Sequence, residues 1–144
     1  MNLFGVLEIS ASAMIAERSR AQVVTSNMAN LETTRTASGG PYQRQLVVFR
    51  SRRMPQFPLM LAGLGGNSAQ GVRVDQVVSD RTPPVRRYEP GHPDADGQGY
   101  VSYPAINPVE EMTDLLGAVR AYELNASAVQ ASKNMIQQAI EILR

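Results

Sequence analysis

Residues 107–143, NPVEEMTDLLGAVRAYELNASAVQASKNMIQQAIEIL, decide the fold class, because they predict one long amphipathic helix over 108–143. Apolar side chains recur at alternating intervals of three and four residues, which is the heptad spacing of a coiled-coil seam. Nine of the ten seam positions are apolar, and Lys133 is the exception. The seam positions are Met112, Leu115, Val119, Tyr122, Ala126, Val129, Lys133, Ile136, Ile140 and Leu143.

The start of this helix carries a capping signal. Asn107 can accept a hydrogen bond from a backbone N–H of the first turn, and Pro108 suits the first helical position. Glu110 stands three residues after the cap, where a capping box places an acidic residue. Glu110 and Glu111 also complement the positive end of the helix dipole. We therefore expect the helix to begin at Pro108.

A second long helix is predicted over residues 3–31 by the same spacing. Seven of its nine seam positions are apolar, with Ser10 and Glu17 as the exceptions. The positions are Leu3, Leu7, Ser10, Met14, Glu17, Ala21, Val24, Met28 and Leu31. Both stripes are too long for a small domain to cover, so we expect the helices to pair with each other, antiparallel, and with neighbouring copies.

The middle of the chain, residues 33–106, is rich in Gly and Pro and predicts short strands. One strand is expected over 42–50, another around Val72 and Val74, and a loose hairpin is expected to join 85–88 with 100–103. The loop 51–70 is left open. The fold class that follows is α+β, as a single domain over 1–144, with a coiled-coil-like helix pair and a small irregular β region.

Composition excludes several classes of protein. The net charge of +1 disfavours nucleic-acid binding by bulk charge, and the absence of cysteine excludes disulfides and thiolate metal sites. The first residues show no basic segment followed by a long apolar one, so no cleavable signal peptide is expected. No stretch approaches the roughly 18–20 continuous apolar residues of a membrane span.

Candidate catalytic groups are few. The single histidine, His92, stands between turn-forming residues with no second base or thiol beside it, which favours a turn residue over a catalyst. Asp94 and Asp96 resemble the start of a calcium loop, but Ala105 stands where an EF-hand needs glutamate. We expect no catalytic residue, cofactor or metal. A metal-dependent enzyme built on His92, Asp94 and Asp96 is the weaker alternative, which metal titration would test.

Four segments of the sequence are distinctive: SASAMIAERSRAQVVTSNMANLETT (10–34), GPYQRQLVVF (40–49), YEPGHPDADGQGYVSYPAINPVEEM (88–112) and RAYELNASAVQASKNM (120–135). The first resembles the signature of flagellar axial proteins. Together the four segments resemble the proximal rod proteins of the bacterial flagellar basal body, within the flagellar rod and hook family. They cover most of the chain in the family's order. Ala105 departs from the family's usual asparagine, and 51–70 matches nothing in the family.

This resemblance implies a non-enzymatic subunit of the shaft that carries torque from motor to hook. The implied partners are other copies of the chain, the FlgB, FlgF and FliE families, and the type III export apparatus, with no nucleic acid and no small-molecule substrate. The implied location is the rod of the basal body, reached without a cleaved signal peptide. The motif and assembly residues carried over are Asn27, Ala29, Asn30, Tyr42, Tyr88, Pro90, Gly91, Glu110, Glu111, Met112 and Tyr122.

An alternative from another class is a small helical adaptor or an export-chaperone-like binding module. It would use the same seams, but it would fold alone and bind one client. A rod subunit is instead expected to keep its terminal helices poorly ordered until partners supply the missing apolar surface. The order of the helices in the dilute monomer therefore distinguishes the two functions.

Overall fold

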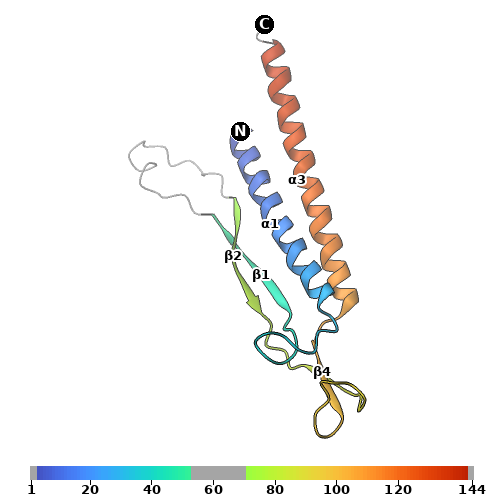
Figure 1. The fold of residues 1–144 in the computed structure, drawn as a ribbon. Coiled ribbons are helices and arrows are strands. Elements are labelled where there is room, and N and C mark those ends of the chain that lie inside the picture. Colours follow the sequence, from blue (N-terminus) through green and yellow to red (C-terminus); the bar gives the residue numbers. More distant parts are fainter. Residues whose placement is uncertain (1–2, 53–70, 143–144) are drawn as a thin grey trace, which may run out of the picture.

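The computed structural model describes residues 3–52 and 71–142. Two long helices, α1 (Leu3–Ala29) and α3 (Pro108–Ile142), lie side by side and antiparallel (Figure 1). The hairpin of β1 (Gln45–Ser51) and β2 (Val72–Ser79) packs along α1. A second hairpin, β3 (Val85–Tyr88) and β4 (Tyr100–Tyr103), lies at the end of the molecule away from the termini (Figure 1). This arrangement confirms the predicted α+β class.

Helix α1 ends at Ala29, two residues before the predicted end, because the next asparagine closes the helix. The backbone N–H of Asn30 donates to the carbonyls of Ser26 and Asn27, both at 3.2 Å. Its side-chain amide donates to the Ser26 carbonyl at 2.9 Å, and its side-chain oxygen accepts from the Thr33 hydroxyl. These bonds satisfy groups that the helix end would leave unpaired.

The start of α3 has the predicted cap. The side-chain oxygen of Asn107 accepts a hydrogen bond from the Val109 N–H at 3.0 Å, and its carbonyl accepts from the Glu111 N–H at 3.1 Å. The side chain of Glu110 reaches back to accept from the Asn107 amide at 3.4 Å. Asn107 is therefore confirmed as the N-cap.

The predicted seam of α3 is divided between two faces. In the described part of the chain α3 packs only on α1, and its buried residues are Glu111, Ala118 and Ser132. Leu115, Val129 and Ile136 lie beside them and are half-buried, whereas Met112, Val119 and Ile140 are exposed. At alternate positions of the predicted seam, the inner face uses the preceding residue, such as Ala118 in place of Val119. Closely packed helices accept small side chains, which a search for apolar spacing passes over.

The described positions of the predicted α1 seam are buried or half-buried. Ser10 and Val24 are buried, and the remaining described members are half-buried: Leu7, Met14, Glu17, Ala21, Met28 and Leu31. The side chain of Leu3, the α3 seam residue Leu143 and residues 53–70 of the loop lie outside the described residues. Among the described residues, the apolar core consists of Ala16, Val24, Val101, Tyr103 and Ala118, so this core is narrow.

The predicted hairpin of 85–88 with 100–103 is present, and the two other predicted strands pair with each other as a second antiparallel hairpin. In the β1–β2 hairpin, Gln45 pairs with Ser79 and Ser51 with Val72, with a register shift between Val48 and Phe49. The first strand begins three residues later than predicted, because the Tyr42 N–H donates to the Thr33 carbonyl instead of to β2. In the β3–β4 hairpin, Val85 pairs with Tyr103 and Tyr88 with Tyr100.

Neither described helix has the continuous apolar length that crossing a bilayer requires.

Candidate functional site

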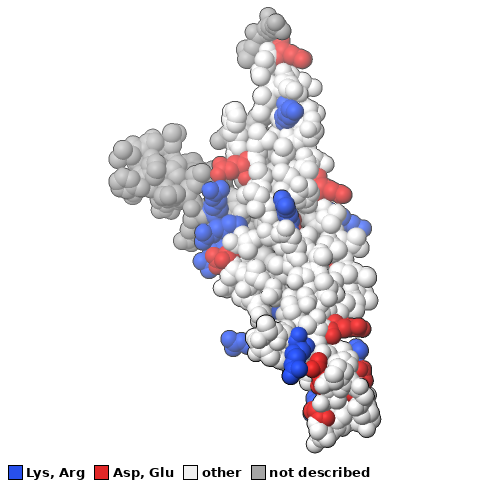
Figure 2. Space-filling model, viewed as in Figure 1, with Lys and Arg blue, Asp and Glu red and all other residues white. Residues whose placement is uncertain are grey.

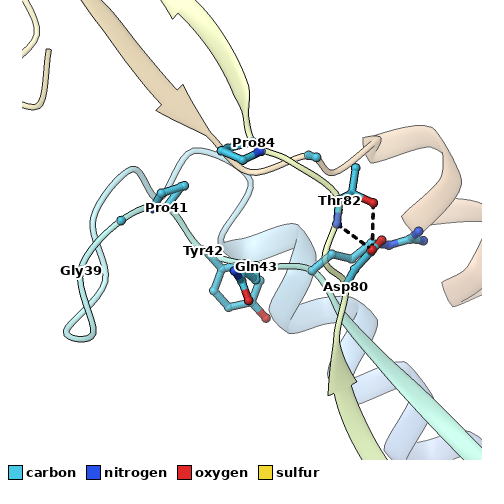
Figure 3. Close-up of a pocket in the computed structure, with 10 residues that line it drawn as sticks. Gly39, Pro41, Tyr42, Gln43, Asp80, Thr82 and Pro84 are labelled. Carbon is cyan, nitrogen blue, oxygen red and sulfur yellow. Dashed lines mark hydrogen bonds between the residues drawn. The ribbon is translucent and has the colours of Figure 1, made fainter. Parts of the chain in front are cut away.

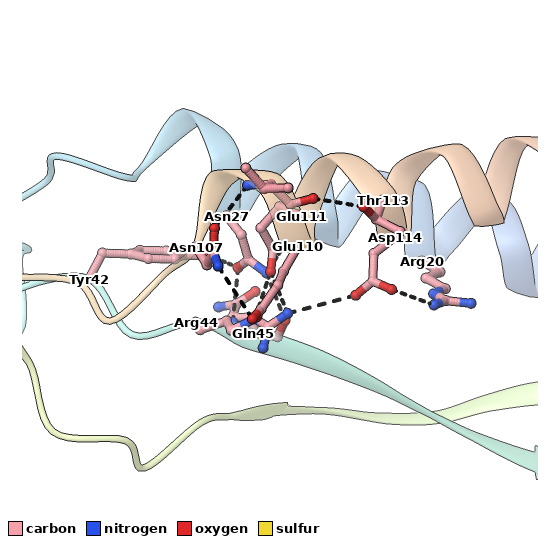
Figure 4. A network of polar contacts seen from close by, with 11 residues as sticks. Arg20, Asn27, Tyr42, Arg44, Gln45, Asn107, Glu110, Glu111, Thr113 and Asp114 are labelled. Carbon is pink, nitrogen blue, oxygen red and sulfur yellow. Dashed lines mark hydrogen bonds and ion pairs between the residues drawn. The ribbon is translucent and has the colours of Figure 1, made fainter.

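A buried polar cluster joins α1, β1 and α3 at the base of the helix pair, and we call it the polar junction (Figure 4). Asn27 of α1 lies at its centre and is 1% exposed. Its amide nitrogen donates to the Gln45 carbonyl at 2.9 Å and to the Glu111 carboxylate at 3.0 Å. Its oxygen accepts from the Gln45 N–H at 2.9 Å and the Tyr42 hydroxyl at 3.1 Å. All four hydrogen bonds that an asparagine side chain can make are therefore formed.

Glu111 supplies the negative charge of the polar junction and is also 1% exposed. The Nε and Nη2 atoms of Arg44 both lie 2.6 Å from its Oε1 atom, while its Oε2 atom accepts from Asn27. A buried carboxylate is tolerated only when charge and hydrogen bonds compensate for lost water. The polar junction provides both, from Arg44 directly before β1 and from Asn27 of α1.

The junction continues along the helix pair through Asp114. Its carboxylate lies 3.0 Å from Arg20 of α1 and 3.7 Å from Arg44 (Figure 4). Two arginines on separate elements therefore face two carboxylates on one turn of α3. Each charged group already has a partner within the chain, so the arrangement fixes elements together and presents no free acid or base.

Asn27, Tyr42 and Glu111 of the polar junction were predicted as site residues from the sequence, whereas Arg20, Arg44 and Asp114 were not. The signal that could have found Arg44 is the position of Glu111, seven residues before Ala118 on the inner face of α3. An acidic side chain on a buried helix face requires a cation from another element. The sequence does not say which of the 13 arginines supplies it.

An exposed apolar stripe runs along the first three turns of α3, and we call it the outer stripe. It consists of Val109, Met112, Leu116 and Val119, which are between 42% and 68% exposed. Their spacing of three, four and three residues is that of a coiled-coil seam, yet no described element covers them. On the face shown in Figure 2, too, most of the helical surface is uncharged.

The upper end of α3 extends beyond α1. Asn27 contacts Glu111, so these two residues are level with each other. Leu3 lies 24 residues before Asn27, and residue 135 lies 24 residues after Glu111, so residue 135 is level with Leu3. Because both helices rise about 1.5 Å per residue, residues 136–142 project roughly 10 Å past the start of α1 (Figure 1). This α3 overhang carries Ile140 and Ile142, which are 61% and 85% exposed.

The turn between β3 and β4 is held by internal contacts. Asp96 accepts hydrogen bonds from the N–H groups of Gln98 and Tyr100, both at 2.9 Å, and pairs with Arg86. The Tyr100 and Gln98 N–H groups, followed by Arg86, lower the pKa of Asp96 below 3.8. Gly99 completes the turn with φ 82°, where a side chain would also collide with Tyr88.

The other candidate metal residues have separate structural contacts. Asp94 accepts from the Thr34 hydroxyl at 2.8 Å and pairs with Arg35 at 3.5 Å, which ties the β3–β4 turn to the α1–β1 loop. The Nδ1 atom of His92 accepts from the Asp94 N–H at 3.1 Å. Among residues 3–52 and 71–142, no three histidine or acidic side chains are grouped as a metal would need.

A cavity of about 260 Å³ lies between the α1–β1 loop and the segment after β2 (Figure 3). Its lining includes Tyr42, Gln43, Asp80, Thr82 and Pro84. The Asp80 carboxylate accepts from the Thr82 hydroxyl at 2.8 Å and from the Thr82 N–H at 3.0 Å, and these bonds lower its pKa. Asp80 therefore serves to cap the bend after β2.

The remaining predicted site residues are dispersed. Ala29 is exposed and Asn30 closes α1. Tyr88 ends β3 and packs edge-on against Tyr100, and Pro90 and Gly91 belong to the β3–β4 turn. Glu110 and Met112 lie on the exposed first turn of α3, and Tyr122 is partly exposed farther along. The structure thus brings together only three of the family-motif residues, Asn27, Tyr42 and Glu111.

Known proteins similar to this one align with almost the whole chain. The family model described as "Flagella basal body rod protein" matches residues 7–35, and the one described as "Flagellar basal body rod FlgEFG protein C-terminal" matches 98–142. The flagellar basal-body rod protein FlgC of Borreliella burgdorferi is 38% identical, over 100% of this chain and 99% of its own. The FlgC proteins of Bacillus subtilis (37%; 99% of each chain) and Aquifex aeolicus (36%; 98% of this chain, 97% of the relative) are similar in the same way.

Proposed function

This chain belongs to the FlgC family of flagellar basal-body rod proteins, and we propose that it assembles through the outward faces of its two terminal helices. As a family member it is a structural subunit of the rod in the bacterial flagellar basal body. The observation that carries the proposed mode of assembly is that pairing of α1 with α3 leaves the outer stripe and the α3 overhang exposed. Contiguous apolar surfaces of this kind mark contacts with other proteins.

The proposed mechanical role is to transmit torque along the rod. Interdigitated side chains resist sliding, because sliding loses many small attractive contacts at once. Long helices packed on neighbouring subunits would therefore stiffen a shaft against bending and twisting. The β1–β2 and β3–β4 hairpins extend from the helix pair and would brace adjacent subunits.

The proposed partners are other copies of this chain and rod proteins of the FlgB, FlgF and FliE families. The type III export apparatus is proposed as the transit partner, with delivery that needs no cleaved signal peptide. Nucleic acid and small-molecule substrates are not among the proposed partners, which the net charge of +1 supports.

We also propose that the chain catalyses no reaction. The engagement of Asp94 with Thr34 and Arg35, and of Asp96 with backbone N–H groups, supports structural roles for both carboxylates. Alanine variants of His92, Asp94 and Asp96 should alter only the turn and its contacts. A purified protein that turned over a substrate, and lost that activity in one of these variants, would contradict the proposal.

The experiment that tests the proposed function is imaging of basal bodies from a strain lacking this chain. We expect loss of motility and of rods, with both restored by the unaltered chain. Complementation by the Met112→Asp and Val119→Asp variants should fail if the outer stripe carries assembly. Intact rods in the deletion strain would reject the role of the chain as a rod subunit.

A further inference from the structure

The α1–α3 seam repeats in a way that permits more than one register. On the inner face of α3, the buried Ala118 and Ser132 and the half-buried Asn125 stand at intervals of seven residues, and the half-buried Leu115, Val129 and Ile136 lie beside them. Sliding one helix by seven residues therefore places a small residue where another small residue stood. Heptad seams of this kind need a specific feature to select one register.

One alternative register would bring the exposed end of α3 into contact with α1. A shift of α3 by one heptad would place Ala118 level with Asn27 and residue 142 level with Leu3. The α3 overhang, including the exposed Ile140 and Ile142, would then lie against α1. Apolar burial alone favours this longer overlap. Another interaction must therefore favour the observed register.

The polar junction supplies that interaction. In the shifted register Glu111 would lie beyond Ala29, the last residue of α1, and Asn27 would face the methyl group of Ala118. The hydrogen bond between Asn27 and Glu111 would be lost, and Arg44 could not keep its position beside the start of β1 and also reach the displaced carboxylate. Leaving buried polar and charged groups without partners is strongly unfavourable.

We propose that the Asn27–Glu111–Arg44 cluster is a register lock, which holds α1 and α3 about one heptad short of their longest apolar overlap. The two chain segments that the family models match, 7–35 and 98–142, meet at this lock through Asn27 and Glu111. The role of the lock rests on the proposed function: the lock keeps the α3 overhang available for a neighbouring rod subunit.

The β3–β4 hairpin does not prevent such a shift. In the described part of the chain neither β3 nor β4 packs on a helix, and Asp94 of the turn contacts Thr34 and Arg35 of the α1–β1 loop. A shift of α3 would cost these contacts at Asp94, which are more exposed than the bonds lost at the polar junction. The register is decided inside the seam, where the buried side chains of Asn27 and Glu111 lie.

Disulfide cross-linking tests the register directly, because the chain contains no cysteine of its own. Ala21 lies six residues before Asn27, and Ala118 lies seven residues after Glu111. The pair Ala21→Cys and Ala118→Cys therefore reports the observed register. Ala21→Cys with Asn125→Cys reports the register shifted by one heptad. Each pair is placed in the parent chain and in an apolar variant carrying Asn27→Leu, Arg44→Met and Glu111→Leu, at a concentration where the parent cross-links.

In the parent, we expect only the Ala21–Ala118 pair to cross-link. In the apolar variant, we expect helix content at least equal to that of the parent and at least a tenfold rise in the Ala21–Asn125 cross-link. A folded apolar variant that cross-links only at Ala21–Ala118 overturns the proposal. An apolar variant that loses its helices also overturns it, because the cluster would then stabilise the fold without selecting a register. Neither result depends on whether deletion strains lose their rods.

Discussion

The guanidinium group of Arg44 lies 2.6 Å from the carboxylate of Glu111, which is almost completely excluded from solvent. Removing the cation leaves a buried charge without compensation. We expect Arg44→Ala to destabilise the helix pair by about 3–5 kcal/mol. Arg52→Ala is the matched control, because Arg52 pairs with Glu8 at the surface across 3.5 Å and should cost at most about 1 kcal/mol. Chemical unfolding of concentrated protein, followed by helical circular dichroism, measures both, and similar values would contradict the expectation.

The N-cap of α3 should contribute measurable helix stability. Asn107→Ala removes the acceptor of the Val109 N–H and should cost about 0.5–2 kcal/mol. Asn107→Asp keeps an acceptor and should be milder. Thermal unfolding of the assembled or partner-bound protein gives the comparison. Equal behaviour of the two variants would show that the cap contributes no stability.

The β3–β4 turn should weaken in acid through Asp96. Because the folded state lowers the pKa of Asp96, the ionised carboxylate stabilises the turn above the ordinary pKa of 3.8. This stabilisation should be lost as the pH falls below 3.8 and through the lowered pKa. NMR of the Gln98 and Tyr100 amide protons between pH 5 and 2 should report the loss. The same transition in Asp96→Asn would assign it to another group.

An aspartate introduced on the outer stripe of α3 should have a different effect from one introduced on the face that packs on α1. Val119→Asp and Met112→Asp change the outer stripe, so they should block assembly while leaving export, monomer solubility and α1–α3 cross-linking intact. Leu115→Asp and Ile136→Asp place a charge beside α1 and should also disrupt the helix pair itself. Basal-body imaging and cross-linking through introduced cysteines separate the two effects. Normal rods with Val119→Asp would remove the outer stripe from the assembly surface.

Much of the fold was predictable because its signals are local. The cap at Asn107 and the strand pairs at 85–88 and 100–103 each depend on residues close together in sequence, and they lie where they were predicted. The face of α3 that packs on α1 was harder to predict. Apolar spacing selects Met112 and Val119, but close helix packing selects the smaller neighbour Ala118 and the charged Glu111.

The polar junction could be predicted only in part. Asn27, Tyr42 and Glu111 belong to segments that resemble a known family, yet no local pattern says that they meet. Their contact depends on the antiparallel register of α1 and α3 and on the α1–β1 loop, which brings Tyr42 to Asn27. Arg44 reaches Glu111 from 67 residues away, and such long-range pairing is not encoded in any spacing along the chain.

Hydrogen exchange on the dilute monomer tests most directly whether the terminal helices are completed by assembly. Ordering costs about 1–2 kcal/mol per backbone residue, and the small side chains of the seam return little of it by burial. We predict weak protection of the amides of 3–31 and 112–143 in the monomer, weakest in the α3 overhang, and strong protection in the assembled rod. Strong protection of both segments at low concentration would contradict this coupling of folding to assembly and would favour a self-sufficient helical adaptor.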